Sequence, residues 1–93
     1  MRYRSRTDII SEILDVANGG SATRTKIMYK AYLSYNQLKE YLMLLTENNL
    51  LSYDAYNQTY RTTEKGLRFL DICNQMDDMI RRAYFFENKR LLH

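Results

Sequence analysis

Apolar residues recur three or four positions apart near the start of the chain, the spacing that gathers side chains on one face of an α-helix. These positions are Ile9, Ile10, Ile13, Leu14, Val16 and Ala17. Ser5 and Asp8 match a capping box, with Thr7 as a competing cap. Asn18-Gly19-Gly20 ends the segment, since glycine readily adopts a left-handed conformation. We therefore predict a first helix over about residues 7–18.

Two further helical segments follow, separated by a break at Leu33-Ser34. The earlier one covers about residues 24–31, with Thr23 or Ser21 as its cap. Ser34-Tyr35-Asn36-Gln37 matches the S-x-x-Q capping box and starts the later one, which fades at Asn48-Asn49. The predicted inward residues are Ile27, Met28 and Ala31 in the earlier segment and Leu38, Tyr41, Leu42 and Leu45 in the later one.

The hydrophobic pattern changes its period after Asn49. Residues 50–54 and 59–62 are short and rich in β-prone side chains, which favours a hairpin. Tyr56-Asn57-Gln58 suits the turn between them, because asparagine tolerates left-handed geometry. Thr63 can then cap a helix from Glu64 to about Leu91, on the order of 42 Å long.

The last predicted helix carries an apolar seam of about two heptads, which is typical of a coiled coil. Its members are Phe69, Cys73, Met76, Ile80, Ala83 and Tyr84. One small domain cannot cover both faces of so long a helix, so its second half either pairs with another copy or folds back. We expect pairing, because the row from Met76 to Phe85 would otherwise form an apolar patch in water.

Three helices, a hairpin and a long helix make a winged helix-turn-helix, an α+β fold that is mainly helical. We assign residues 1–63 to the winged domain with a basic N-terminal arm, and residues 64–93 to a long dimerisation helix. In this geometry the third helix enters the major groove of DNA, and its first residues meet base edges.

The outward face of that third helix holds the candidate base contacts. With Leu38 inward and about 100° added per residue, Asn36, Lys39 and Glu40 turn outward and Gln37 lies between. Amides can pair with adenine, lysine with guanine or phosphate, and Glu40 with cytosine, although a carboxylate repels phosphate. The same pattern is equally that of a solvated helix face.

Positive charge is concentrated in the first third of the chain. The whole sequence has a net charge of +3, and residues 1–33 alone hold six arginines and lysines against three acidic residues. A basic region attracts phosphate by releasing counterions, although such charge is also ordinary on a solvated surface. Arg2, Arg4 and Arg6 can enter a minor groove as a flexible arm, or remain a frayed terminus. Among nine tyrosines, most of them expected to be half-buried, Tyr56 at the wing tip is the best candidate for a phosphate contact.

The sequence does not predict an enzyme. The single histidine is His93, the single cysteine Cys73 lies on an apolar stripe where it suits the core, and Gly19-Gly20 is a helix stop. We therefore expect no catalytic residue, metal site, cofactor or small-molecule substrate. No apolar run reaches the length of a membrane helix, and the basic start lacks the apolar segment of a secretory signal. With its lone cysteine, the protein is expected to be cytoplasmic and nucleoid-associated.

Two runs, TKIMYKAYLSYNQLKEYLMLL and YRTTEKGLRFL, resemble the archaeal winged-helix DNA-binding proteins of the 10a chromatin-protein type. The likeness covers about residues 7–72, and LSYxQLKEYLxxL together with TxKG are its more specific pieces. It implies a winged domain followed by a long helix that pairs with a second copy as an antiparallel coiled coil. The wing departs from a good phosphate clamp, because its charges are limited to Asp54 and Arg61. The tail from Tyr84 to His93 is more aromatic than a simple coiled coil.

These features predict a homodimer that binds double-stranded DNA, as a transcriptional regulator reading the major groove with residues 35–48. Two alternatives remain. One is a protein-interaction module, which the acidic Glu40 and Glu47 favour, and the other is a non-specific architectural chromatin protein. The predicted DNA-binding residues are Arg4, Arg6, Arg24, Lys26, Lys30, Ser34, Tyr35, Asn36, Gln37, Lys39, Glu40, Tyr56, Asn57 and Arg61.

Overall fold

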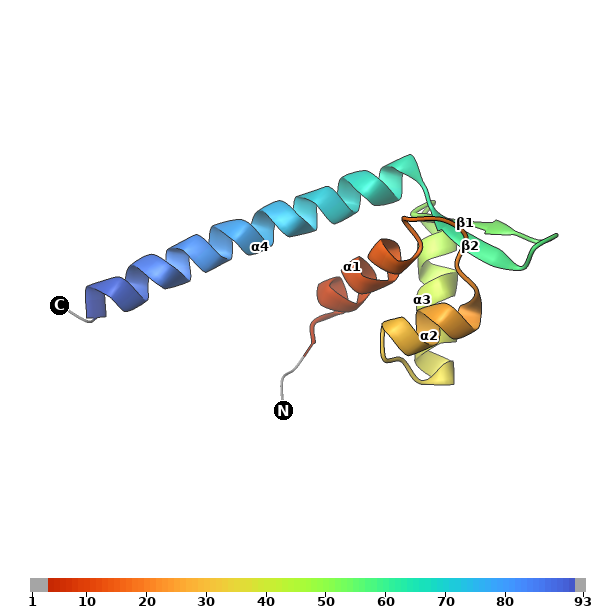
Figure 1. The fold of residues 1–93 in the computed structure, drawn as a ribbon, viewed down its shortest axis with the longest axis horizontal. Helices are drawn as coiled ribbons and strands as arrows, with labels where there is room; N and C mark the ends of the chain where they lie inside the picture. Colours follow the sequence, from red (N-terminus) through yellow and green to blue (C-terminus); the bar gives the residue numbers. More distant parts are fainter. Residues whose placement is uncertain (1–3, 92–93) are drawn as a thin grey trace.

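The computed structural model describes residues 4–91, and the side chains of residues 4–85. Its elements are α1 (Arg6–Val16), α2 (Arg24–Lys30), α3 (Tyr35–Glu47), β1 (Leu51–Asp54), β2 (Thr59–Thr62) and α4 (Glu64–Leu91) (Figure 1). This order confirms the predicted winged helix-turn-helix followed by a long helix. The predicted helix ends are correct to within two residues, the largest difference being that α1 ends at Val16 instead of near residue 18.

Side-chain caps fix where the helices begin. Ser5 Oγ accepts from the Asp8 N–H and the Asp8 carboxylate accepts from the Ser5 N–H, each at 3.0 Å, so the predicted capping box of α1 is confirmed. Thr23 and Thr63 cap α2 and α4 by accepting from the N–H three residues further on, at 3.2 and 3.0 Å. Each cap satisfies a backbone donor that the first turn of a helix leaves free.

The turn between α2 and α3 is tight and contains a residue with positive φ. Tyr32 has φ of 53°, which is uncommon and costly for a bulky side chain. The guanidinium of Arg4 donates to the Ala31 carbonyl at 2.6 Å and to the Tyr32 carbonyl at 2.9 Å. It also pairs with the Glu12 carboxylate of α1. Arg4 therefore ties the turn to the first helix.

The two strands form an antiparallel wing that is joined to the rest of the domain. Tyr53 lies opposite Tyr60, and their rings are 4.7 Å apart. Ala22, just before α2, exchanges two backbone hydrogen bonds with Tyr60, at 2.9 and 2.8 Å. The buried Thr62 hydroxyl donates to the Leu14 carbonyl of α1 at 2.6 Å. The base of the wing is thus anchored on both α1 and the segment that leads into α2.

The left-handed residue of the wing turn is not the one that the sequence predicted. The Asp54 carboxylate accepts from the Tyr56 N–H at 3.0 Å, the Asn57 N–H at 3.3 Å and the Asn57 side-chain amide at 2.7 Å. The left-handed residue is Gln58, with φ of 54°, and not Asn57. Because Asp54 holds both the backbone and the side chain of Asn57, the reversal falls on the next residue.

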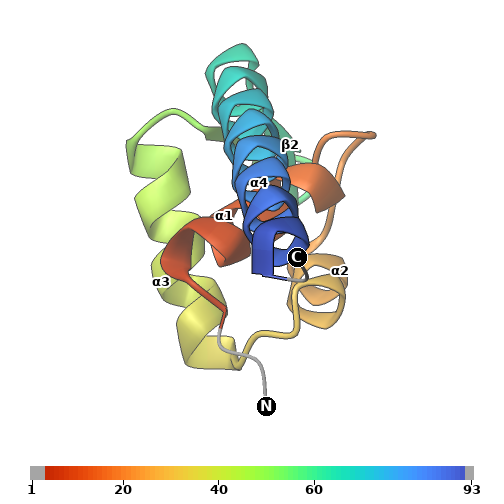
Figure 2. The same cartoon turned by 90° about the vertical axis from the view of Figure 1, so that its left-hand side faces the viewer.

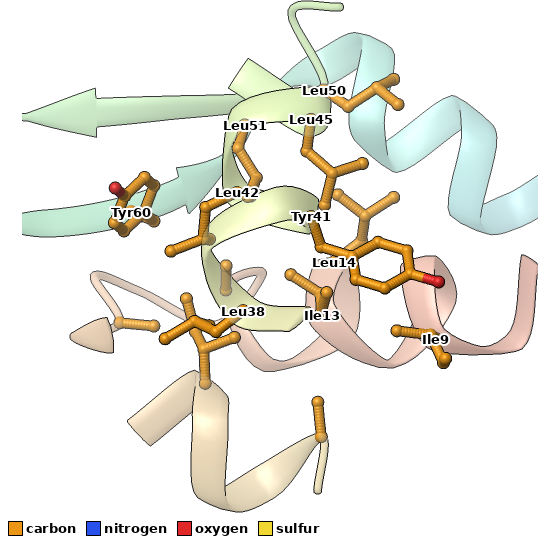
Figure 3. Packing of buried hydrophobic residues seen from close by; sticks show 14 of the residues in the cluster. Ile9, Ile13, Leu14, Leu38, Tyr41, Leu42, Leu45, Leu50, Leu51 and Tyr60 are labelled. Carbon is orange, nitrogen blue, oxygen red and sulfur yellow. The ribbon is translucent and has the colours of Figure 1, made fainter. Parts of the chain in front are cut away.

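The core lies between α1, α2, α3 and the base of the wing. The predicted inward stripe of α3 is confirmed, since Leu38, Tyr41, Leu42 and Leu45 are all buried. Figure 3 shows these side chains packing toward Ile13 and Leu14 of α1 and toward Tyr60 of β2. In α1, the predicted Ile10 and Val16 are partly buried at the edge of the cluster.

The long helix begins against this core and then extends past it. A Cβ on Gly66 would lie 2.3 Å from the Leu50 carbonyl oxygen, so glycine permits the close approach of the first turn. Leu70 and Cys73 are buried, and hollows lined by α1 residues continue along α4 to Ile80 and Arg81, so α4 borders its own domain over this part of its length. Beyond it the helix projects away from the domain, at the end opposite the wing (Figures 1 and 2). The molecule is consequently elongated, with extents of 59 × 29 × 20 Å.

Candidate nucleic-acid interface

The outer face of α3 is exposed, as predicted. Asn36, Lys39, Glu40, Met43 and Glu47 all face solvent in the described part of the chain. The same helix buries its opposite stripe in the core, so this face is held rigidly toward the outside. Its two edges differ in chemistry, and each borders a shallow hollow.

The hollow on the wing side of α3 combines cations and hydroxyl groups. It has a volume of about 180 Å³ and brings together residues from α2, α3 and β2. Two cations, Arg24 and Lys39, and two tyrosines, Tyr35 and Tyr60, line it together. The complete lining is Arg24, Tyr35, Leu38, Lys39, Leu42, Met43, Thr46 and Tyr60. Cations and phenols on one edge suit contacts with a DNA strand.

The hollow on the other edge of α3 is acidic at its rim and apolar at its floor. It measures about 340 Å³ and is lined by Arg6, Glu40, Tyr41, Met43, Leu44 and Glu47. Leu44 and Met43 are exposed by 38% and 59%. Its two carboxylates outnumber its one cation, Arg6, so this edge suits the DNA backbone less well than the edge next to the wing. Arg6 therefore lies near the acidic edge and apart from Arg24 and Lys39.

Two predicted DNA-binding residues, Ser34 and Gln37, serve the local structure of α3. Ser34 Oγ accepts from the Gln37 N–H at 3.2 Å, and the Gln37 side-chain oxygen accepts from the Ser34 N–H at 3.0 Å. This is the predicted S-x-x-Q capping box. The cap turns the amide oxygen of Gln37 back toward the Ser34 N–H, which makes Gln37 less suited than Asn36 to a bidentate contact with adenine. Asn36 is exposed and carries its amide at the centre of the outer face.

The cations of α2 do not form one cluster. Lys26 and Lys30 are exposed and, being four residues apart, share one flank of the helix. Arg24 is turned by about 160° from Lys26 around the helix axis. Of these three residues, Arg24 alone borders the hollows next to α3 and the wing.

Arg24 is held in place by a residue that sequence reasoning missed. Its guanidinium donates to the Tyr60 hydroxyl at 3.3 Å. This hydrogen bond is the main reason why the pKa of Arg24 lies above its already high usual value, with further contributions from the neighbouring Tyr53 and Tyr35. The alternation of Tyr60 with Arg61 along β2 could have indicated that Tyr60 faces inward. No local pattern links it to Arg24, which is 36 residues away.

The wing exposes Tyr56 almost completely, at 94%. Asn57 is also exposed and braced by Asp54. Arg61 points to solvent from β2, on the opposite face of the strand from the buried Tyr60. The wing tip is therefore polar, with its anionic Asp54 engaged by three donors from Tyr56 and Asn57.

The prediction that Arg4 belongs to a flexible basic arm is wrong. Its side chain binds Glu12 and the carbonyls at the end of α2, so it is part of the domain and does not reach outward. Sequence could not show this, because the acceptors include carbonyls 27 and 28 residues away. Arg2 lies outside the described residues.

The predicted dimer seam needs one correction. Cys73 is only 6% exposed because it packs within its own chain, and Phe69 is partly buried against the core. The large apolar side chains that face solvent on the second half of α4 are Met76, Met79, Ile80, Tyr84 and Phe85, with Ile72 before them. The small Ala83 of the predicted seam is exposed among them. The aromatic tail beyond Phe85 lies outside the described side chains.

Within the described residues, no group of three or more potential metal ligands gathers in one place. The helices there also include none that is long and apolar enough to cross a membrane.

The chain belongs to the winged helix-turn-helix family, whose model matches residues 3–81. Its fold is shared with Sso10a-2, which is described as a DNA-binding protein from Sulfolobus solfataricus and has a known crystal structure. The two structures superpose with a TM-score of 0.81 over 92% of each chain, at 23% sequence identity. This match confirms, at the level of fold, the resemblance to archaeal winged-helix proteins of the 10a type. A search of curated proteins found no match.

Proposed function

We propose that this protein binds double-stranded DNA with α3 in the major groove, as a homodimer joined along α4, and regulates transcription on the nucleoid in the cytoplasm. The observation that carries the proposal is the edge where α2, α3 and the wing meet. There Arg24, Lys39 and the phenols of Tyr35 and Tyr60 surround one hollow. The description of Sso10a-2 as DNA-binding supports the same conclusion.

The two edges of α3 suggest how DNA would lie. The cationic edge next to the wing takes the phosphate backbone, and the acidic edge with Glu40 and Glu47 faces away from it. Asn36 between them is the best-placed side chain for reading a base edge, because Gln37 is engaged in the helix cap. Lys39 contributes charge whichever base it meets.

Fluorescence anisotropy with labelled duplexes, over about 50 to 200 mM salt, tests the DNA contact. We expect Lys39→Ala to weaken binding to every duplex, and Asn36→Ala to change the preference among sequences. Gln37→Ala is expected to act on helix stability as well. Arg82→Ala removes the same charge from α4, far from the wing, and serves as the matched control. If Lys39→Ala, Asn36→Ala and Gln37→Ala all bound DNA with the affinity of the wild type, α3 would not be the contact surface.

The dimer proposal is supported by the exposed apolar row on α4. Met79 and Ile80 are 68% and 61% exposed, although both are large and apolar. A contiguous row of this kind is unusual on the surface of a soluble monomer. A second copy related by a two-fold axis would cover it and would present two α3 helices to DNA. The antiparallel arrangement is the one that the family resemblance implies.

Analytical ultracentrifugation tests the dimer. Ile80→Asp puts a carboxylate into the apolar row and is expected to yield monomers at concentrations where the wild type is dimeric. Asn74→Asp places the same charge on the polar side of α4 and should leave the dimer intact. An Ile80→Asp protein that stays dimeric would refute this contact surface.

A specific regulator is favoured over an architectural protein by the modest net charge of +3. Non-specific packaging depends on many phosphate contacts, and this surface offers few cations. Selection from a random-sequence DNA pool separates the two roles. Enrichment of one motif supports a regulator, and unchanged sequence composition after several rounds supports an architectural role.

An interaction module is the second candidate, and one specific observation favours it. The hollow lined by Tyr41, Met43 and Leu44 between Glu40 and Glu47 is apolar with an acidic rim, which suits a basic protein segment. Winged helices are scaffolds for more than one function. Failure to bind any duplex at about 50 mM salt, where phosphate contacts are strongest, would favour this second candidate.

A further inference from the structure

The wing presents a puzzle for DNA binding, because it lacks the cations that usually hold the backbone. Arg61 is the single positive residue of the hairpin, and it points away from the face that carries Tyr60. Yet the wing is anchored firmly to α1 and to the segment before α2. On the face of the wing that carries Tyr60, the neighbouring cation comes from another element, Arg24 of α2.

Arg24 is held by a residue that is itself fixed from several sides. Tyr60 is 5% exposed, exchanges two backbone hydrogen bonds with Ala22 and packs its ring against Tyr53. Its hydroxyl oxygen accepts from Arg24, which leaves its own proton available to donate. The guanidinium is therefore kept at the junction of α2 and the wing, instead of moving freely on a long side chain.

Next to this guanidinium lies a polar hollow of about 470 Å³. Its lining is Thr23, Arg24, Thr25, Tyr53, Asn57 and Gln58. Arg24 is the charged member, and the others offer hydroxyl or amide donors. Thr23 Oγ1 accepts from the Lys26 N–H, so the hydroxyl proton remains free to donate outward. One fixed cation among neutral donors is the chemistry that recognises a singly charged phosphodiester.

Resting on the proposed DNA binding, we propose that this hollow binds one backbone phosphate of the duplex, that Arg24 is its cationic contact, and that Tyr60 positions Arg24. The wing then contributes neutral donors at its tip, and Arg24 supplies the cation that this face of the wing does not carry. Tyr60 does not itself have to touch DNA, so its role is distinct from those of the exposed residues on α3.

A double-mutant cycle in DNA binding tests the arrangement, with Arg24→Ala, Tyr60→Phe and the double variant measured against mixed-sequence duplexes. Arg24→Ala is expected to reduce the steepness of the plot of log affinity against log salt by about 0.9 for each subunit bound to the duplex, the contribution of one phosphate contact per subunit. Tyr60→Phe keeps the ring and is expected to weaken binding roughly twofold to tenfold, the range of one hydrogen bond. In the Arg24→Ala background, Tyr60→Phe should change nothing further.

Three controls separate this inference from its alternatives. Circular dichroism melting checks that Tyr60→Phe is folded, and Arg82→Ala should leave the salt dependence unchanged. Inorganic phosphate at the ionic strength of the assay should compete no better than sulfate, because the site is proposed for a phosphate carried on a duplex.

Each outcome decides between the proposals. A wild type that binds DNA while Arg24→Ala keeps its full salt dependence overturns the phosphate site and leaves DNA binding standing. Additive losses from Arg24→Ala and Tyr60→Phe overturn the positioning role of Tyr60. A wild type that binds no duplex at low salt overturns both this inference and the proposed function.

Discussion

Residues of one type serve different purposes in this protein, and their neighbours determine which. Arg4 and Arg24 are both arginines in the basic first third of the chain. Arg4 satisfies two carbonyls and a carboxylate inside the domain, whereas Arg24 binds a phenol and borders two open hollows. Net charge in a sequence window therefore overestimates the charge that remains free for a ligand.

The structural role of Arg4 leads to a stability prediction. Arg4→Ala removes hydrogen bonds that hold the left-handed turn before α3, and it should lower the free energy of unfolding by about 1–2 kcal/mol. Urea unfolding followed by circular dichroism measures this loss. Arg6→Ala, which changes an exposed residue of the same charge, should stay within about 0.5 kcal/mol of the wild type. Similar losses from both variants would show that Arg4 has no special role in the turn.

Gly66 gives a second prediction at the residue scale. The Cβ of an alanine would lie 2.3 Å from the Leu50 carbonyl oxygen and 2.7 Å from the Thr62 methyl carbon. Backbone must shift to relieve this overlap, so Gly66→Ala should destabilise the domain by about 1–3 kcal/mol despite the better helix propensity of alanine. Gly19→Ala has no atom within 4 Å of its new Cβ and is the control. Thermal melting of the two variants compares them, and equal melting temperatures would contradict the prediction.

At the scale of elements, sequence was most informative where the signal is local. Caps lie three residues from the donors they satisfy, and inward stripes repeat every three or four residues, so α1, α3 and α4 were predicted nearly to the residue. The bridge from Ala22 to Tyr60 and the fit of Gly66 against Leu50 depend on chain segments that meet only in the folded domain. Cys73 shows what periodicity cannot predict. It belongs to the same apolar stripe of α4 as Met76 and Ile80, yet Cys73 is buried in the domain and the other two are exposed.

The same reasoning applies to the candidate site. Lys39 and Asn36 could be predicted to face outward from the period of α3, because the opposite stripe is apolar. The division of that helix into a cationic and an acidic edge could not be predicted from the sequence, because it depends on where α1, α2 and the wing lie. The role of Gln37 was ambiguous for a different reason, because the same side chain fits both a cap and a base contact.

The stability of the wing turn is predicted to fall at acid pH. The side-chain hydrogen bond from Asn57, followed by backbone donors, lowers the pKa of the Asp54 carboxyl below its usual value. A group with a lowered folded-state pKa stabilises the fold above its unfolded pKa, and this contribution is lost as pH falls through the folded value. Amide exchange at Tyr56 and Asn57, measured relative to the intrinsic rate, should therefore lose protection at acid pH.

Asp54→Ala is the variant that checks this assignment. It should remove the acid dependence of protection in the wing and leave protection at neutral pH as low as that of the wild type at acid pH. Protection of α3 amides is the internal reference, because the hydrogen bonds of the Asp54 carboxylate go to Tyr56 and Asn57 within the wing turn. Unchanged acid behaviour in the variant would place the titrating group elsewhere.

At the scale of the whole molecule, the protein has two ends with different chemistry. The winged domain and its polar wing lie at one end, and the exposed apolar part of α4 extends from the other (Figure 1). Hollows lined by α1 residues reach Met76 and Ile80, yet Ile80 is still 61% exposed and Met79 and Tyr84 are each 68% exposed, so the domain itself does not bury this apolar part. The proposed dimer thus uses surface that the winged domain leaves free.

Dimer formation predicts that stability depends on protein concentration. Association through α4 favours the folded form, so the melting temperature of the wild type should rise as concentration is raised. The melting temperature of Ile80→Asp should not change with protein concentration, and that of Asn74→Asp should rise as it does for the wild type. Differential scanning calorimetry makes the comparison, and a wild type with a constant melting temperature would argue for a monomer.

The length of α4 has a consequence for evolution as well as for assembly. In a paired form, the separation of the two α3 helices is set by 28 residues that need not touch DNA. Inserting seven residues would lengthen the helix by about 10 Å while nearly preserving the orientation of its faces. Since successive turns of the major groove are about 34 Å apart, such insertions would change which target spacings fit without altering the base-contacting surface. Spacing preference and base preference could then diverge independently among relatives.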